Sequence, residues 1–243
     1  DKPFSVDSKV ERVAKANRSG DISWFMRWFG AQRGPGKLTL DEFFYYGLDR
    51  RTPDAAELGR YVGKRAQTPM HLACNESGWF AVAHDKLLLH RLLTGAELPC
   101  PPLQSVFRRG PDDEEGFFGS REGLGRFLNE RASYPLFAKP IQGIYSIGAM
   151  RLDGCDGGAL RLSGVEDAVP VARFADYAER IDKQGYLFQS LLAPQREWRE
   201  SFGDTLPSAR VMVLLEEGVA EVHVATLKIP DGTHDADNFW REG

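Results

Sequence analysis

The segment that most constrains this chain runs from Tyr134 to Gly148. An apolar stretch ends in Lys139 and Pro140, and a loop rich in small residues follows it. Proline cannot donate to a strand ladder, so the pattern predicts a strand that stops here and turns. It also puts one cation beside a turn whose backbone N–H groups can approach an anion, as polyphosphate sites require. A simple strand-end turn is the alternative.

Composition limits the protein classes to consider. The chain has 243 residues, of which 42% are hydrophobic and 27% charged, as in an ordinary globular protein of one large or two small domains. A net charge of -4 argues against a nucleic-acid partner. No apolar run approaches the roughly 20 residues that cross a bilayer, so no membrane partner is expected.

The three cysteines, Cys74, Cys100 and Cys155, are odd in number and lie far apart, with no metal-binding spacing. They fit a reducing compartment, and the first residues show no signal peptide. We therefore expect a cytoplasmic protein.

The N-terminal part, residues 1–75, is predicted to be a helical subdomain. Apolar residues recur every three to four positions through Phe25, Trp28 and Phe29. Thr39 with Glu42 three residues later is the pattern of a capping box. The aromatic run that follows, Phe43 to Tyr46, is expected to pack in a core, with a binding platform as the minor alternative.

The rest of the chain alternates predicted helices and strands. A helix is expected after Asp85, ending at Gly95, and further helices over residues 120–131 and 170–184. The acidic run 112–115 is expected to be a solvated loop. Glycine-containing turns predict hairpins over residues 151–161 and 210–229, with Val222 and Val224 facing inward in the second. Residues 186–192 are apolar enough for a buried strand.

Four cations stand beside these apolar elements: Lys86, Lys139, Arg210 and Lys228. Charges in such places are costly without anionic partners. Together they could neutralise a triphosphate and the charge that develops in phosphoryl transfer. Each one alone could equally be a surface cation. The five histidines show no spacing to serine or cysteine that suggests a hydrolase triad.

Four stretches of the chain resemble one family: Gly36–Leu48, Asp85–Pro101, Phe137–Gly148 and Leu206–Val211 with Asp237–Phe239. By these motifs, and their order over nearly the whole chain, it is similar to the ATP-grasp superfamily. The specific group is the sugar-transfer-associated ATP-grasp family, also called alpha-L-glutamate ligase-related.

The resemblance implies an α+β, ATP-grasp fold, in which two α+β lobes clasp ATP after a helical N-terminal subdomain. The first lobe, with its linker helix, would cover residues 76–185. The second would cover residues 186–243 and is expected to be truncated at Gly243.

The resemblance also assigns roles to residues. Lys86 and Lys139 would contact the phosphates, under a flexible loop that contains Gly143, Ser146 and Gly148. Adenine would lie against Phe188 and Gln189 and bond to the backbone of Gln189 and Leu191. Arg210 and Lys228 would be catalytic, and Asn238 would contact the cofactor. ATP and Mg²⁺ would be the cofactors, with the metal ligands unknown.

The implied activity is that of an ATP-dependent carboxylate–amine, or carboxylate–nucleophile, ligase that works through an acyl-phosphate. Its substrates would be small-molecule, sugar or peptide carboxylates and amines, and a homo-oligomer is left open. The alternatives are an ATP-grasp-like domain that binds nucleotide or a partner without turnover, and phosphotransfer to a hydroxyl.

Overall fold

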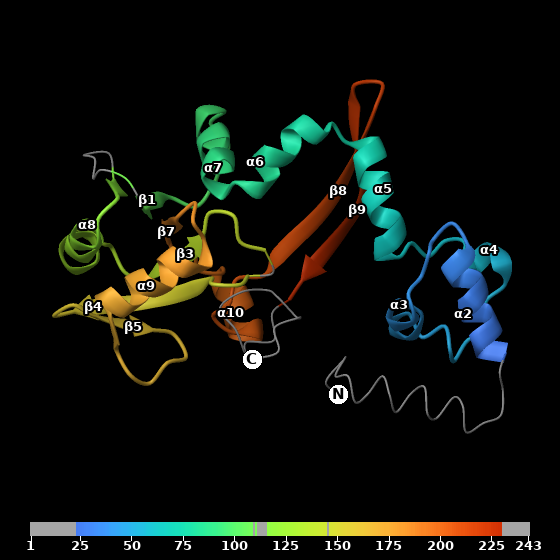
Figure 1. Ribbon diagram of the computed structural model, residues 1–243, viewed down its shortest axis with the longest axis horizontal. Coiled ribbons are helices and arrows are strands. Elements are labelled where there is room, and N and C mark those ends of the chain that lie inside the picture. Colours follow the sequence, from blue (N-terminus) through green and yellow to red (C-terminus); the bar gives the residue numbers. More distant parts are fainter. Residues whose placement is uncertain (1–22, 109, 111–115, 145, 230–243) are drawn as a thin grey trace. The chain divides into compact units, whose positions relative to one another are not determined.

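A computed structural model describes residues 23–108, 110, 116–144 and 146–229. The chain divides into two compact units, Asp1–Phe80 and Ala81–Gly243 (Figure 1). The first boundary expected from the sequence is residue 75. Among the described residues, no helix has the length and apolar composition needed to cross a bilayer.

The first unit is helical, as predicted from residue 23 onward. Its elements in chain order are α2 (Ser23–Arg33), α3 (Leu40–Tyr45), α4 (Ala55–Leu58), α5 (Lys64–Cys74) and the 3₁₀ turn η1 (Ser77–Trp79). The capping box at α3 is confirmed, because the Thr39 hydroxyl accepts from Glu42 N while the Glu42 carboxylate accepts from Thr39 N. The aromatic run divides: Phe43 and Phe44 are buried, whereas Tyr45 is 52% exposed.

The second unit is a mixed α and β structure built on one large sheet. Its elements in chain order are α6 (Phe80–His84), α7 (Lys86–Gly95), β1 (Leu103–Phe107), β2 (Phe117–Phe118), α8 (Arg121–Arg126), the π-helical turn η2 (Phe127–Arg131), β3 (Leu136–Pro140), β4 (Met150–Asp156), β5 (Ala159–Leu162), β6 (Val169–Pro170), α9 (Val171–Ile181), β7 (Tyr186–Ser190), α10 (Arg196–Phe202), β8 (Ser208–Glu216) and β9 (Val219–Lys228). The protein therefore belongs to the α+β class.

Seven strands form the large sheet in the order β2-β1-β7-β3-β4-β5-β6. Only β1 and β2 run parallel; the other neighbours are antiparallel. β7 lies between β1 and β3, although the expected lobe boundary at residue 186 would have placed it in a second lobe. Long-range pairing decides this position, since β7 follows both partners in the chain by many residues.

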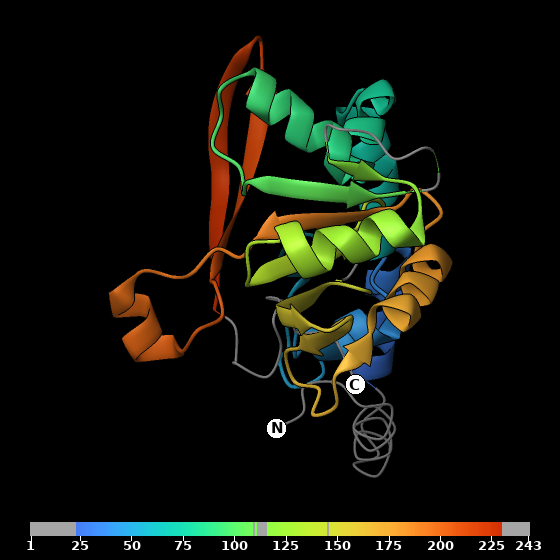
Figure 2. The same ribbon diagram turned by 90° about the vertical axis from the view of Figure 1, so that its left-hand side faces the viewer.

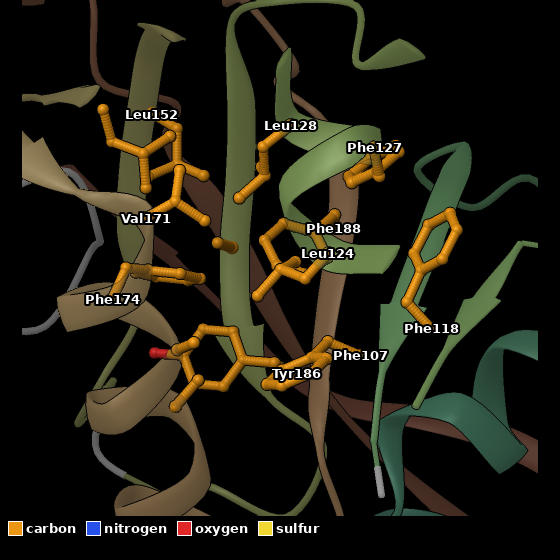
Figure 3. Close-up of a cluster of buried hydrophobic side chains, with 14 of the residues drawn as sticks. Phe107, Phe118, Leu124, Phe127, Leu128, Leu152, Val171, Phe174, Tyr186 and Phe188 are labelled. Atoms are coloured by element: carbon orange, nitrogen blue, oxygen red, sulfur yellow. The ribbon is translucent and has the colours of Figure 1, made fainter. Parts of the chain in front are cut away.

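Helices cover one face of this sheet. Alternate residues of β3 and β7, among them Leu136, Ala138 and Phe188, point to that face and are fully buried. They pack against Leu124 of α8 and Phe174 of α9. Figure 2 shows the two helices over the strands, and Figure 3 shows the side chains between them. Each large side chain buried here stabilises the fold by roughly 1.5–3 kcal/mol.

The opposite face is covered only in part. Leu87 of α7 is buried there against Val106, Ile141 and Leu187. Helix α7 starts at Lys86 because the Asp85 carboxylate accepts hydrogen bonds from the N–H groups of the first turn. Other side chains on this face, from β3 and β7, line a cavity.

Both predicted hairpins form. β4 and β5 pair antiparallel and are joined by Gly157 and Gly158, whose positive φ angles suit a tight turn. β8 and β9 form a separate two-stranded ribbon. The expectation that Val222 and Val224 face inward is wrong for the described residues, since these side chains are 66% and 45% exposed.

Candidate functional site

A cavity of about 490 Å³ opens on the sheet face that α8 and α9 leave uncovered. Its size suits a nucleotide-sized ligand. Its walls come from the start of α7, the strands β3, β4 and β7, the loop after β3, and the segment before β8. The lining residues are Lys86, Pro101, Phe137, Lys139, Pro140, Gly143, Ser146, Ile147, Ala149, Arg151, Gln189, Ser190, Leu191, Leu192, Asp204, Thr205, Leu206 and Ser208.

Strand register sets the floor of this cavity. Phe137 on β3 lies directly opposite Gln189 on β7 and opposite Arg151 on β4. Directly opposite residues point to the same face, so these three side chains form one row. Lys139 is two positions further along β3 and shares that face. A half-buried aromatic ring thus lies between an amide and a guanidinium, with an ammonium beside it.

Lys139 is partly removed from water. Burial and, to a smaller extent, the nearby positive charge of Lys86 together lower the pKa of its ammonium to about 8. The ammonium lies 5.7 Å from the centre of the Phe137 ring, which attracts it only weakly. An anion bound beside Lys139 would stabilise its charged form and offset the effects of burial and of the Lys86 charge.

Lys86 faces the same cavity from the first turn of α7. Its Nζ donates to the carbonyl oxygens of Gly143, at 2.6 Å, and Ile141, at 3.2 Å. Burial lowers the pKa of Lys86, while the carboxylates of Asp182 and Asp85 act in the opposite direction. The predicted pair of phosphate lysines is therefore brought to one cavity, although Lys86 comes from a helix end rather than from a strand edge.

His90 is a neighbour of this pair that sequence analysis did not select. It lies one turn after Lys86 on α7, and burial, followed by the charges of Lys139 and Arg91, lowers its pKa. Its Nδ1 lies 3.4 Å from the Cys100 sulfur. The sequence does contain a signal for His90: it lies four residues after Lys86 on a predicted helix, and residues with this spacing are neighbours on the helix surface.

The loop after β3 contributes two of its three predicted residues to the lining. Gly143 and Ser146 line the cavity, whereas Gly148 is buried behind it. The carbonyl of Gly148 accepts a hydrogen bond from the Tyr186 hydroxyl. Its φ of +78° and the Pro140 ring 2.9 Å from a would-be Cβ leave room for glycine alone. Gly148 therefore shapes the end of the loop.

The expected adenine contacts are met in part. Gln189 and Leu191 line the cavity, but Phe188 is fully buried in the core on the opposite sheet face. The Leu191 N–H donates to the carbonyl of Pro135 at 3.2 Å, so this backbone group already has a partner. Phe137 supplies the aromatic surface that had been expected from Phe188.

The Gln189 side chain makes a hydrogen bond at the cavity wall. It is 4% exposed, and its Nε2 donates to the carbonyl of Pro101 at 3.2 Å. That bond orients the amide so that Nε2 faces the wall.

Arg210 and Lys228 lie on the ribbon and are not among the lining residues. Ser208, which does line the cavity, pairs with Lys228, and Arg210 pairs with Thr226. Opposite residues and alternate residues share a face, so Arg210 and Lys228 are diagonal neighbours on the face that bears Ser208. Their catalytic assignment stays a prediction. Asn238 lies outside the described residues.

The residues described do not fit a protein-held Mg²⁺ at this site. Within them, no group of three or more His, Cys, Asp or Glu side chains is arranged for a metal ion. Of the described lining residues, Asp204 alone carries a carboxylate, and this carboxylate pairs with Arg199 at 3.1 Å.

Comparison with protein-family models, curated proteins and solved structures finds no match to this chain. The structure itself defines an α+β protein with a seven-stranded mixed sheet, one face of which carries a cavity lined by cationic side chains.

Proposed function

We propose that this protein is an ATP-dependent ligase of the ATP-grasp kind, which joins a carboxylate to an amine or another nucleophile. The observation that carries the proposal is the pairing of Lys86 and Lys139 in one nucleotide-sized cavity whose floor is the Phe137 ring. The resemblance of the sequence motifs to ATP-grasp enzymes supports the same reading.

The charges favour a polyphosphate. Among the lining residues that the structure describes, three are cations, Lys86, Lys139 and Arg151, and one is a carboxylate, Asp204. Burial and, after it, the positive charge of Lys86 raise the energy of the charged form of Lys139, which is why the pKa of Lys139 is lowered. A triphosphate would reverse that penalty, since its negative charge is attracted to both groups.

The aromatic floor favours a nucleotide over inorganic phosphate. A base lying on Phe137 would contact an apolar ring on one side and the polar edge of Gln189 next to it. Stacking of a base on an aromatic side chain is worth about 1–3 kcal/mol. Phosphates held by Lys139 would then lie two residues further along the same strand.

In the proposed reaction, a carboxylate oxygen attacks the γ-phosphorus of ATP. The bond from that phosphorus to the bridging oxygen breaks, ADP leaves, and an acyl-phosphate forms. An amine nitrogen then attacks the acyl carbon, phosphate leaves with the bonding electrons, and the nitrogen loses a proton. Arg210 and Lys228 are the proposed stabilisers of the transferred phosphoryl group.

A second candidate is nucleotide binding without turnover. The placement of Arg210 and Lys228 outside the cavity lining favours it, because the cavity then has binding groups but lacks the proposed catalytic cations.

Release of ADP and phosphate tests the two candidates. The protein is incubated with ATP, Mg²⁺ and a panel of sugar acids, amino acids and short peptides with amines. A ligase releases both products only when a carboxylate and a nucleophile are supplied together. A binding domain shows ATP-dependent thermal stabilisation without product. The absence of any ATP-dependent stabilisation would rule out both.

A further inference from the structure

Asp182 lies in the turn between α9 and β7, next to the start of the loop that follows β3. It is the C-cap residue that follows α9, and it is partly buried. Its Oδ2 accepts a hydrogen bond from the backbone N–H of Gln142 at 2.7 Å, and its Oδ1 accepts from Gln184 N at 2.8 Å. Both carboxylate oxygens are therefore used to hold backbone.

Lys86 holds Ile141 and Gly143, the residues on either side of Gln142, through their carbonyl groups. Its ammonium donates to the carbonyls of Ile141 and Gly143, and its own N–H donates to Ile141 O at 3.1 Å. The N–H of Ile141 in turn donates to Gly185 O at 3.0 Å. Residues 141–143 are thus fixed from two sides, by a carboxylate on the α9–β7 turn and by an ammonium on α7.

This arrangement fixes the ammonium as well as the loop. An ammonium has three N–H donors, and two of them point at the carbonyls of Ile141 and Gly143. The third is left for a ligand in the cavity that Lys86 lines. Asp182 is the strongest of the carboxylates that favour the charged form of Lys86 against its burial.

We infer that Asp182 is a positioning residue of the phosphate site. It sets the place of residues 141–143 and of the Lys86 ammonium without lining the cavity itself. The inference rests on the proposed function, because it takes the ligand of Lys86 to be the phosphate chain of ATP. No sequence motif points to Asp182, which lies 96 residues after Lys86 in the chain.

Asp182→Asn tests the inference. The amide keeps the size of the side chain and one acceptor oxygen, but it loses the charge and cannot accept both backbone N–H groups. Glu166→Gln is the matched control, since it removes one carboxylate charge from an exposed residue outside the cavity lining. Circular dichroism of both variants checks that the fold is retained.

Three measurements on the full chain are compared with the wild type. Hydrogen exchange without ligand should become about 10-fold faster at residues 141–143 in Asp182→Asn, as expected for the loss of one charge-assisted hydrogen bond. NMR titration of the lysine side chains should show the pKa of Lys86 falling further, which a purely structural role would not cause. Calorimetric titration with ATP should show binding weakened by about 10-fold. Glu166→Gln should leave all three unchanged.

Unchanged hydrogen exchange, or an unchanged affinity for ATP in Asp182→Asn, would overturn the inference. Equal effects in Glu166→Gln would do so too, because they would reflect net charge. The wild-type titration separates this failure from that of the proposed function: if the wild type binds no ATP, the proposed function is lost, and the positioning role with it.

Discussion

Phe137 and Lys139 occupy alternate positions on one face of β3, and the Lys139 ammonium lies 5.7 Å from the centre of the Phe137 ring. A surface for a base and a group for a phosphate are therefore adjacent on a single strand. Because a strand is stiffened by its neighbours on both sides, the spacing between the two groups is fixed before any ligand arrives. This relationship underlies the first three predictions.

Lys139→Met should abolish most of the stabilisation by ATP and leave the unliganded fold intact. The substitution removes a charge-assisted bond to phosphate, worth about 1.5–3 kcal/mol, but keeps the apolar stem of the side chain. Thermal unfolding with and without ATP measures the effect. Lys183→Met, at an exposed lysine outside the cavity lining, is the control and should respond to ATP like the wild type.

The stability of the unliganded protein should depend on pH through Lys139. Its pKa is about 8 in the folded state against an ordinary value of 10.5, so the unfolded chain binds more protons between these values. Stability must therefore rise with pH from about 8 to about 10.5, relative to Lys139→Met, which cannot titrate. Urea unfolding of both proteins at several pH values measures this difference. A difference that is constant across the window would contradict the lowered pKa.

Phe137→Ala should weaken binding of ATP but not of inorganic triphosphate. Loss of stacking should reduce the affinity for ATP by about 10-fold or more, since base stacking is worth about 1–3 kcal/mol. Phe137→Tyr keeps the ring face and should bind ATP like the wild type. Calorimetric titration with both ligands distinguishes the cases, and an equal loss for both ligands would place the base elsewhere.

Arg210→Ala should spare ATP binding and reduce turnover by about 100-fold or more, as expected when a group that stabilises the transition state is removed. The residue is exposed on the ribbon, so its truncation should not unfold the protein. His223→Ala, at an exposed residue of β9 outside the cavity lining, is the control. Single-turnover measurement of ADP release gives the rate. Normal turnover in Arg210→Ala would exclude the residue from the reaction.

The hairpins and the capping box could be predicted from sequence because they depend on a few neighbouring residues. Gly157 and Gly158 permit the positive φ angles of the β4–β5 turn, and Thr39 caps α3 through Glu42, only three residues away. Local geometry of this kind is fixed by side-chain chemistry within one turn.

The aromatic residue at the cavity was harder to predict. Alternation along β3 and β7 shows that Phe137 and Leu136 face opposite ways, as do Phe188 and Gln189, but it does not show which face the helices cover. Packing of α8 and α9 buries Phe188 and leaves Phe137 at the cavity. The expectation of Phe188 came from the family resemblance, which places adenine against this strand but does not show which residue of the strand faces the cavity.

From the sequence alone came the helices α7, α8 and α9, the strands β3 and β7, the two hairpins and the two lysines as candidates for one anion. The tertiary structure alone decided that β7 pairs between β1 and β3, that Phe137 faces the cavity, and that Asp182 reaches Gln142. Turns and caps are governed by contacts within a few residues, whereas these three features depend on pairing and packing between segments far apart in the chain. A short stretch of sequence does not contain that information.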